Sequence, residues 1–224
     1  MPPSSSLDIF CDFLSASIHL VLYVRRVYPR EIFERRRCLD VTTFKARHPE
    51  LCEYIALVVD GARQLLMRGE ADALVISIRD ARHTLLERIR FDLRLSGELP
   101  EDAPALATRL RGFLLKLHVA DSLLPGLPAS EHLSFTAELH TVAARSQQPL
   151  PVSLLEAWAE ETVPPHCDEA MDTGSAASRG SQRSPSVVPL KSMCFEGLTL
   201  ALSVLSAPAA SELQHAAPTG SASG

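Results

Sequence analysis

The sequence lacks the motifs that usually carry acyl-transfer, metal or nucleotide chemistry. It contains no GxSxG, no HExxH, no P-loop and no GxGxxG. No sequence motif therefore indicates any of these reaction classes. The five cysteines are an odd number and none lies in a CxxC pair, so we expect free thiols, no disulfide and no zinc site. The run from His166 to Asp168 is the remaining candidate for an enzyme. Its adjacent side chains point in different directions, whereas a metal site needs converging ligands.

The chain also lacks an excess of basic residues. Its 22 Lys and Arg stand against 27 Asp and Glu, for a net charge of -5, and direct nucleic-acid binding usually requires a positive field. No apolar run reaches ~18 residues, and the N-terminus has no basic segment followed by an apolar one. We therefore expect an intracellular protein with no membrane contact, and any link to DNA should be indirect.

The residues that are present predict one compact domain with three helices. A chain of 224 residues with 46% hydrophobic content can bury one core of ordinary size. Apolar residues at helical spacing run from Phe10 to the stop at Pro29, from His48 to Gly69, and from Asp102 to Pro125. The double arginine near the end of the first helix, Arg25 and Arg26, is expected to be exposed.

Alternating apolar residues predict strands in four places. These stretches are 74–78, 89–93, 133–139 and 198–204. We expect the first two to form an antiparallel hairpin with one solvent-facing side. Residues 172–186 and the tail 207–224 are too polar to bury, and together with residues 1–7 they are predicted to be disordered. Helices covering one face of a largely antiparallel sheet define an α+β fold.

Several blocks of the sequence, in this order, resemble the HORMA-domain family. They are Cys11 to Leu14, His19 to Pro29, Ile32-Phe33, His48 to Leu51 with Tyr54-Ile55, Arg111 to Lys116, His140-Thr141 and Pro189 to Met193. Within this family, the sequence resembles the mitotic-arrest-deficient-like branch, which contains the accessory subunit of DNA polymerase zeta. It implies a HORMA domain over residues 8–206, with a core of three helices on a sheet (8–140) and a mobile C-terminal safety belt (141–206).

The resemblance also implies a pocket for a proline-containing partner peptide. Tyr54 and Trp158 match positions that form this pocket in the family, and we place Pro189 and Leu190 in the same peptide-binding set. Flat aromatic faces offer a proline ring a large, rigid contact area. For Tyr54 the alternative is plain core packing, because it lies on the apolar stripe of the second helix.

Two further surfaces are implied in the same way. Val187, Ala201 and Ser203 match a surface that docks a Y-family translesion polymerase in the family. Ala201 and Ser203 are small where the family has polar and aromatic anchors, so we expect this contact to be weakened or re-routed. Arg111 matches a contact between HORMA domains, with Arg35 and Lys116 on the rim of the same surface; a solvated surface charge is the alternative for Arg111.

The function implied by the resemblance is that of a non-catalytic adaptor without cofactor or metal. It would trap a proline-containing peptide of the polymerase zeta catalytic subunit under the belt and bridge it to a Y-family polymerase. A HORMA homo- or heterodimer and a nuclear location, with the cytoplasm second, belong to this hypothesis. The alternatives are a spindle-checkpoint or meiotic-chromosome adaptor, an enzyme using His166 or Cys167, and a divergent paralogue that has lost its ligand.

Overall fold

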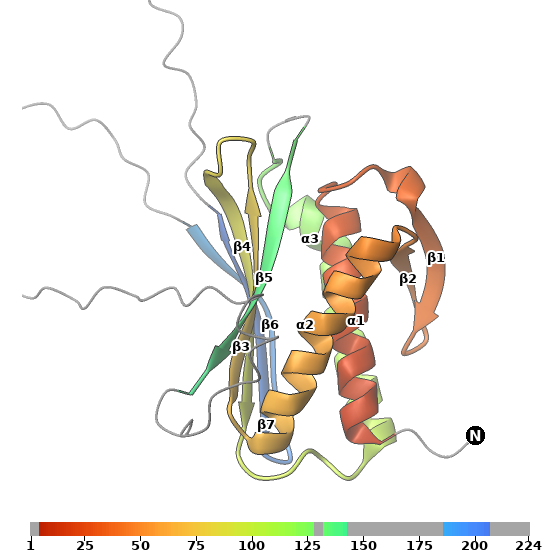
Figure 1. Ribbon diagram of the computed structural model, residues 1–224. Coiled ribbons are helices and arrows are strands. Elements are labelled where there is room, and N and C mark those ends of the chain that lie inside the picture. The colour runs from red at the N-terminus through yellow and green to blue at the C-terminus, as the bar shows by residue number, and fades with distance from the viewer. Residues whose placement is uncertain (1–4, 128–131, 143–185, 207–224) are drawn as a thin grey trace, which may run out of the picture.

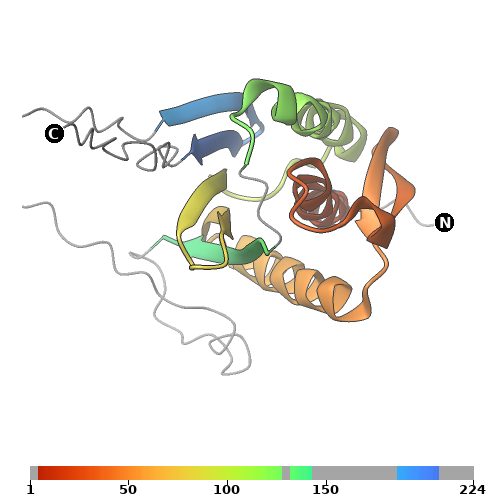
Figure 2. The same cartoon turned by 90° about the horizontal axis from the view of Figure 1, so that it is seen from above.

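The computed structural model describes residues 5–127, 132–142 and 186–206, and these form three layers. A five-stranded sheet is covered on one face by three helices, and a two-stranded hairpin lies on the other side of the helices (Figure 1). Seen from above, α1 lies in the middle of the helical layer with α2 and α3 on either side (Figure 2). The predicted α+β class with three helices on an antiparallel sheet is confirmed.

Helix α1 (Ser6–Val24) is the central helix of the core. Ser5 caps it and forms a capping box with Asp8, so the helix begins two residues before the predicted domain start at residue 8. The helix is apolar and long enough to cross a membrane by length and composition alone. We assign it to the core instead, because α2, α3 and β2 pack around it.

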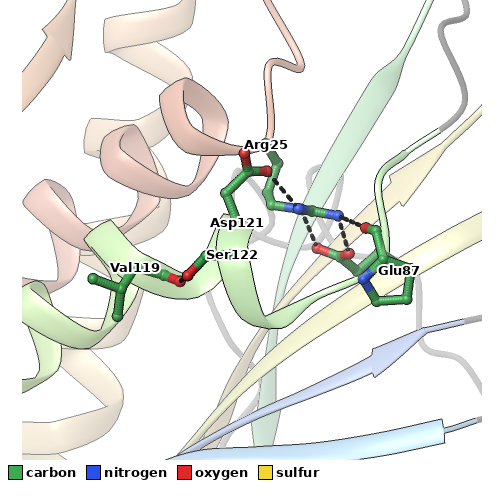
Figure 3. Close-up of polar contacts among 6 residues, drawn as sticks. Arg25, Glu87, Val119, Asp121 and Ser122 are labelled. Carbon is green, nitrogen blue, oxygen red and sulfur yellow. Dashed lines mark hydrogen bonds and ion pairs between the residues drawn. The ribbon is translucent and has the colours of Figure 1, made fainter.

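The end of α1 differs from the sequence prediction. The helix ends at Val24 rather than at Pro29, and the prediction that Arg25 is exposed is wrong, because only 4% of this residue is accessible. Its guanidinium donates to both carboxylate oxygens of Glu87 at 3.0 and 2.7 Å, to Asp121 at 2.8 Å and to the Pro125 carbonyl at 2.7 Å (Figure 3). Burial raises the pKa of the Glu87 carboxyl, and the Arg25 charge opposes that rise. The arginine therefore ties α1 to the sheet and to the end of α3.

The other two helices follow their sequence signals closely. Helix α2 (Pro49–Arg68) begins with proline in its first turn and ends at Gly69, which adopts the left-handed conformation with φ of 66°. Helix α3 (Ala103–Leu123) is capped by Asp102, whose side chain accepts from the Ala105 amide at 2.9 Å. Both predicted helices are confirmed.

The sheet has the strand order β5-β3-β4-β7-β6, and every neighbouring pair is antiparallel. Its strands are β3 (Ala71–Arg79), β4 (Leu85–Leu95), β5 (Ser134–Thr141), β6 (Ser186–Phe195) and β7 (Leu198–Ser206). The four predicted strands correspond to β3, β4, β5 and β7. Strand β6 was not predicted, and it carries Pro189 at a register shift on the edge of the sheet, where a missing amide donor is tolerated.

The prediction that the β3–β4 hairpin has one wet face is wrong for β3. Val75 and Ser77 point away from the helices, yet they are 1% and 0% exposed. Arg90 and Arg88 lie opposite them on β4, and the Arg88 guanidinium donates to the Ser77 hydroxyl at 3.4 Å. Long charged side chains thus cover the outer face of this strand.

The hairpin of β1 (Phe33–Cys38) and β2 (Val41–Ala46) was not predicted from the sequence. It follows a short 3-10 turn, Arg30–Ile32, and rests on the helices through aromatic and histidine contacts. The Phe44 ring stacks on Tyr23 with 3.7 Å between centroids, and the His118 ring bonds the Thr42 carbonyl at 2.5 Å. Three consecutive arginines in β1 hide the alternation that marks a strand.

Candidate functional site

Strand β5 forms an open edge of the five-stranded sheet. It pairs with β3 on one side, and no other strand in the described part of the chain pairs with it. Such an edge presents free amide donors and carbonyl acceptors to an added strand. The next described strand along the chain, β6, lies at the opposite edge of the sheet.

An aromatic groove lies beside this edge. It has a volume of about 450 Å³ and is lined by Tyr28, Pro29, Ile32, His48, Glu50, Leu51, Tyr54 and Phe135. The Phe135 ring meets Tyr54 edge-on at 5.5 Å between centroids and Tyr28 edge-on at 6.2 Å. The groove therefore offers rigid aromatic surface next to a free strand edge, which suits a peptide that carries a proline.

Tyr54 connects the groove to the strand edge. Its hydroxyl accepts a hydrogen bond from the Ala137 amide at 2.9 Å and lies 3.4 Å from the Ala137 carbonyl, to which it donates. Since these backbone groups bond Tyr54, they point away from β3, and the hydroxyl occupies one position on the open edge. Burial is the main cause that raises the pKa of Tyr54, so the phenol stays protonated at neutral pH. Tyr54 packs against the core and also faces the groove.

The other residues of the predicted peptide-binding set do not lie beside Tyr54. Pro189 and Leu190 belong to β6, which β3, β4 and β7 separate from β5. Leu190 is 9% exposed and packs in the core, whereas Pro189 is exposed. Trp158 lies outside the described residues, so its place in the pocket remains a prediction.

The predicted second surface lies on the outer face of the sheet. Ala201 and Ser203 alternate with buried leucines of β7, and Val187 on β6 is 62% exposed. Arg90 lies opposite Ser203 and Asp92 opposite Ala201 on the neighbouring strand, and the two charged side chains pair at 2.7 Å. The surroundings of the two small residues are thus an ion-pair network.

The predicted dimer residues gather where α3 meets the β1–β2 hairpin. Arg111 donates to the Leu39 carbonyl at 2.9 Å and to the Asp40 carboxylate at 2.7 Å, both in the hairpin turn. Arg35 and Arg111 line the same hollow, which has a volume of about 560 Å³. Lys116 is exposed on α3. The structure therefore gives Arg111 partners within the chain and places it on a surface shared with Arg35.

An exposed apolar stripe on α3 was missed in the sequence. Leu115, Val119 and Leu123 are 52%, 48% and 53% exposed, and they follow one another at four-residue spacing. The signal was present as a second row of apolar residues, beside the row from Leu106 to Leu117 that is buried. This stripe borders the hollow that contains Arg111.

The candidate residues for chemistry are two undescribed residues and four described free thiols, of which Cys194 is exposed. His166 and Cys167 belong to the undescribed residues, and within the described ones no group of three His, Cys, Asp or Glu could hold a metal ion. Cys11, Cys38, Cys52 and Cys194 are free thiols. Burial raises the pKa of Cys11 and of Cys38 to about 11, which disfavours the nucleophilic thiolate at neutral pH.

Comparison with known proteins relates this geometry to one family. The model of the HORMA domain matches residues 6–110. The human mitotic spindle assembly checkpoint protein MAD2B is 30% identical over 206 residues, which cover 88% of this chain and 89% of that protein. The Arabidopsis thaliana DNA polymerase zeta processivity subunit is 31% identical over 134 residues, 58% of this chain and 62% of that protein.

Solved structures agree on the fold. A chain of the mitotic checkpoint complex superposes with a TM-score of 0.67 at 16% identity, covering 90% of this chain and 98% of that one. Caenorhabditis elegans HTP-2 bound to the HIM-3 closure motif superposes with a TM-score of 0.56 at 10% identity, covering 88% and 87%. At such low identities the likeness concerns the fold alone.

Proposed function

Because the chain belongs to the HORMA-domain family, with relatives named MAD2B and DNA polymerase zeta subunits, we propose that it is a non-catalytic adaptor of a translesion polymerase. Its partner would be the catalytic subunit of DNA polymerase zeta. The adaptor would capture a proline-containing segment of that subunit. Its role would be to assemble the polymerase complex.

One observation carries the proposal: an aromatic groove opens directly beside the unpaired edge of β5. A captured segment would add to β5 as a further strand, so that main-chain hydrogen bonds supply affinity. Its proline would pack on the rings of Tyr54, Tyr28 and Phe135. The Tyr54 hydroxyl would have to leave the Ala137 backbone wherever the new strand pairs with that residue.

The non-catalytic part of the proposal rests on the character of the groove. The phenols of Tyr28 and Tyr54 have pKa values raised by burial, and a protonated phenol is a poor nucleophile or base. The lining also contains His48 and Glu50, but most of it is apolar and aromatic surface. Such a site favours binding over bond breaking.

The safety belt completes the proposed mechanism. It comprises residues 141–206, of which residues 142–185 join β5 to the hairpin of β6 and β7 on the opposite edge of the sheet. Because this connection runs between opposite edges of the sheet, it favours the hypothesis that the belt holds the captured peptide against β5. We propose that Trp158 contributes a second aromatic face to the pocket.

Bridging to a Y-family polymerase would use the outer face around Val187, Ala201 and Ser203. The exposed Val187 is the apolar anchor here, while Arg90 and Asp92 lie beside the two small residues. We therefore propose that a partner docking here makes more polar contacts than aromatic ones. A HORMA dimer would instead use α3, where the exposed apolar stripe borders Arg111 and Arg35.

A nuclear location follows from the proposed polymerase partner, with the cytoplasm as a second site. The second candidate function is a spindle-checkpoint or meiotic-chromosome adaptor, which the relatives named as checkpoint proteins favour. The same groove and edge would then hold a closure segment of a different protein. The two functions differ in the partner's peptide and not in the site.

The test is a titration of the full chain with a proline-containing peptide from the polymerase zeta catalytic subunit. Tyr54→Ala and Trp158→Ala should each weaken binding at least about tenfold, because an aromatic anchor in a central pocket contributes on the order of 2 kcal/mol. Tyr54→Phe keeps the ring and removes the hydroxyl, so it should bind the peptide at least as tightly as the unmodified chain.

Met67→Ala is the control, because Met67 is 72% exposed on the same helix and lies outside the groove. It should leave the affinity unchanged. Unchanged binding by Tyr54→Ala, with the fold intact by circular dichroism, would refute capture at this groove. Tight binding of a checkpoint or meiotic closure peptide in place of the polymerase peptide would favour the second candidate.

A further inference from the structure

Positive charge is concentrated in one segment of the chain. Residues 26–47 contain seven Arg and Lys against three Asp and Glu, a net charge of +4 within a chain whose net charge is -5. The segment consists of the turn after α1 and the β1–β2 hairpin. A local positive surface therefore exists although the whole chain is acidic.

Most of these cations are exposed and have no carboxylate partner. Arg36 pairs with Glu34, and Arg37 pairs with Asp40 at 3.2 Å. The remaining cations, which form no ion pair within the described part of the chain, are Arg26, Arg30, Arg35, Lys45 and Arg47. All five are exposed. Their charge is thus available to a partner.

The same hairpin carries another open strand edge. Strand β1 pairs only with β2 among the described residues, and it is the outer strand of the layer that lies on the far side of the helices from the sheet (Figure 1). Its central residues Arg35, Arg36 and Arg37 are exposed, and they alternate between the two faces of the strand.

We propose that the free edge of β1 binds an acidic segment of a partner protein, which adds to the hairpin as a third strand. Same-face side chains of an added strand repeat every ~6.6 Å, the spacing of Arg35 and Arg37 along β1. Acidic residues on both faces of that strand meet arginines on both faces of β1. The occupant is defined by this charge and by its extended backbone.

Two other occupants fit less well. A second copy of the chain would bring the arginines of one β1 against those of the other, and like charges on facing strands are destabilising. A nucleic acid would satisfy the guanidiniums, but phosphates offer only acceptors, whereas a strand edge presents donors and acceptors in turn. Charged edge residues also protect against unwanted strand pairing, and here they exclude neutral and basic strands while admitting an acidic one.

The open edge of β1 is separate from that of β5, although Tyr28, Pro29 and Ile32 in the turn before β1 line the groove. The sheet and the hairpin lie on opposite sides of the helical layer (Figure 2), so one molecule has room for a strand on each edge. The β1 proposal therefore does not depend on the proposed function. A chain that binds no polymerase peptide would still bind the acidic strand.

The experiment is a fluorescence polarisation titration of the full chain with a labelled ten-residue peptide in which Glu alternates with Val and Thr. The alternating Glu residues all lie on one face of the added strand, so the variant removes the two arginines that share a face of β1. Arg35→Gln/Arg37→Gln should weaken binding about fivefold, the effect of losing two exposed charge pairs. The control Arg82→Gln/Arg94→Gln removes two exposed arginines from β4 and the turn before it, and it should bind like the unmodified chain. Tyr54→Ala should also bind normally.

Two further probes decide how the peptide binds. The same peptide methylated on alternate backbone nitrogens keeps its charge but cannot pair with a strand edge, and it should bind at least about fivefold more weakly. A single-stranded oligonucleotide of equal net charge should bind more weakly than the peptide. Equal binding of the methylated peptide or of the oligonucleotide, or no loss with Arg35→Gln/Arg37→Gln, would overturn the proposal.

Discussion

At the residue scale, burial holds His19 in its neutral form. The side chain lies in α1 and is 2% exposed, and its Nδ1 accepts from the Ala46 amide of β2 at 3.4 Å. Burial, assisted by the nearby Lys45 charge, lowers the pKa of His19 from 6.5 to about 4. A protonated ring would lose both its acceptor and its fit to this site.

We therefore expect His19 to lower the free energy of unfolding as the pH is lowered. Above pH 6.5 the ring is neutral in both states and contributes no pH dependence. Between pH 6.5 and about 4 the unfolded chain binds a proton that the folded chain does not, which removes up to ~3 kcal/mol of stability. Urea unfolding at pH 7.5 and pH 5 measures this difference.

The control for this prediction is the pair His19→Leu and His83→Gln. His83 is exposed in the turn between β3 and β4, so its replacement should leave the pH dependence intact. The His19→Leu chain should lose part of the difference between the two pH values. An equal pH dependence in all three proteins would contradict the assignment.

Single residues also show where sequence reasoning stops. Tyr54 could be singled out, because its ring lies on the helical stripe of α2 and matches a family position. Its bond to the Ala137 backbone could not be foreseen, since it depends on how α2 crosses β5. Arg25 was misassigned for the same reason: only the tertiary fold brings Glu87 and Asp121 to it.

At the element scale, periodic elements were predictable and charged ones were not. Helices α2 and α3 carry both apolar spacing and end signals, and their bounds agree with the sequence. The hairpin of β1 and β2 has neither, because arginines occupy half of β1. Its position is fixed by contacts with Tyr23 and His118, which lie on other elements.

The contact between α3 and β6 gives a prediction at this scale. Gly112 lets the Lys191 side chain cross α3, and a Cβ at Gly112 would lie 2.8 Å from Lys191 Cε. The Lys191 ammonium stands 5.4 Å from the centre of the Phe113 ring. Gly112→Ala should therefore change stability little, since a helix-propensity gain of ~1 kcal/mol is offset by displacing Lys191 from the ring.

The matched variant is Lys191→Ala, which removes the crossing side chain. In that background Gly112→Ala should stabilise the chain by the full ~1 kcal/mol in urea unfolding. The same effect of Gly112→Ala in both backgrounds would show that Lys191 does not restrict this position.

At the scale of the whole molecule, the described elements present an open strand edge on each side of the helices. The edge of β5 lies beside apolar rings, and the edge of β1 lies among arginines. The order of the sheet, with β6 and β7 added next to β4, is what leaves β5 open. No local pattern in the sequence encodes that order, so the open edge was predictable only through the family resemblance.

The central claim is that a partner segment adds to β5, and residue-resolved amide hydrogen exchange tests it most directly. Alternate β5 amides point away from β3, as the bond from Ala137 to Tyr54 shows. Binding of the proline-containing polymerase peptide should slow exchange at Phe135, Ala137 and Leu139. The amides on the open edge of β6 should exchange as before. Protection on β6 with none on β5, at saturating peptide, would contradict the account.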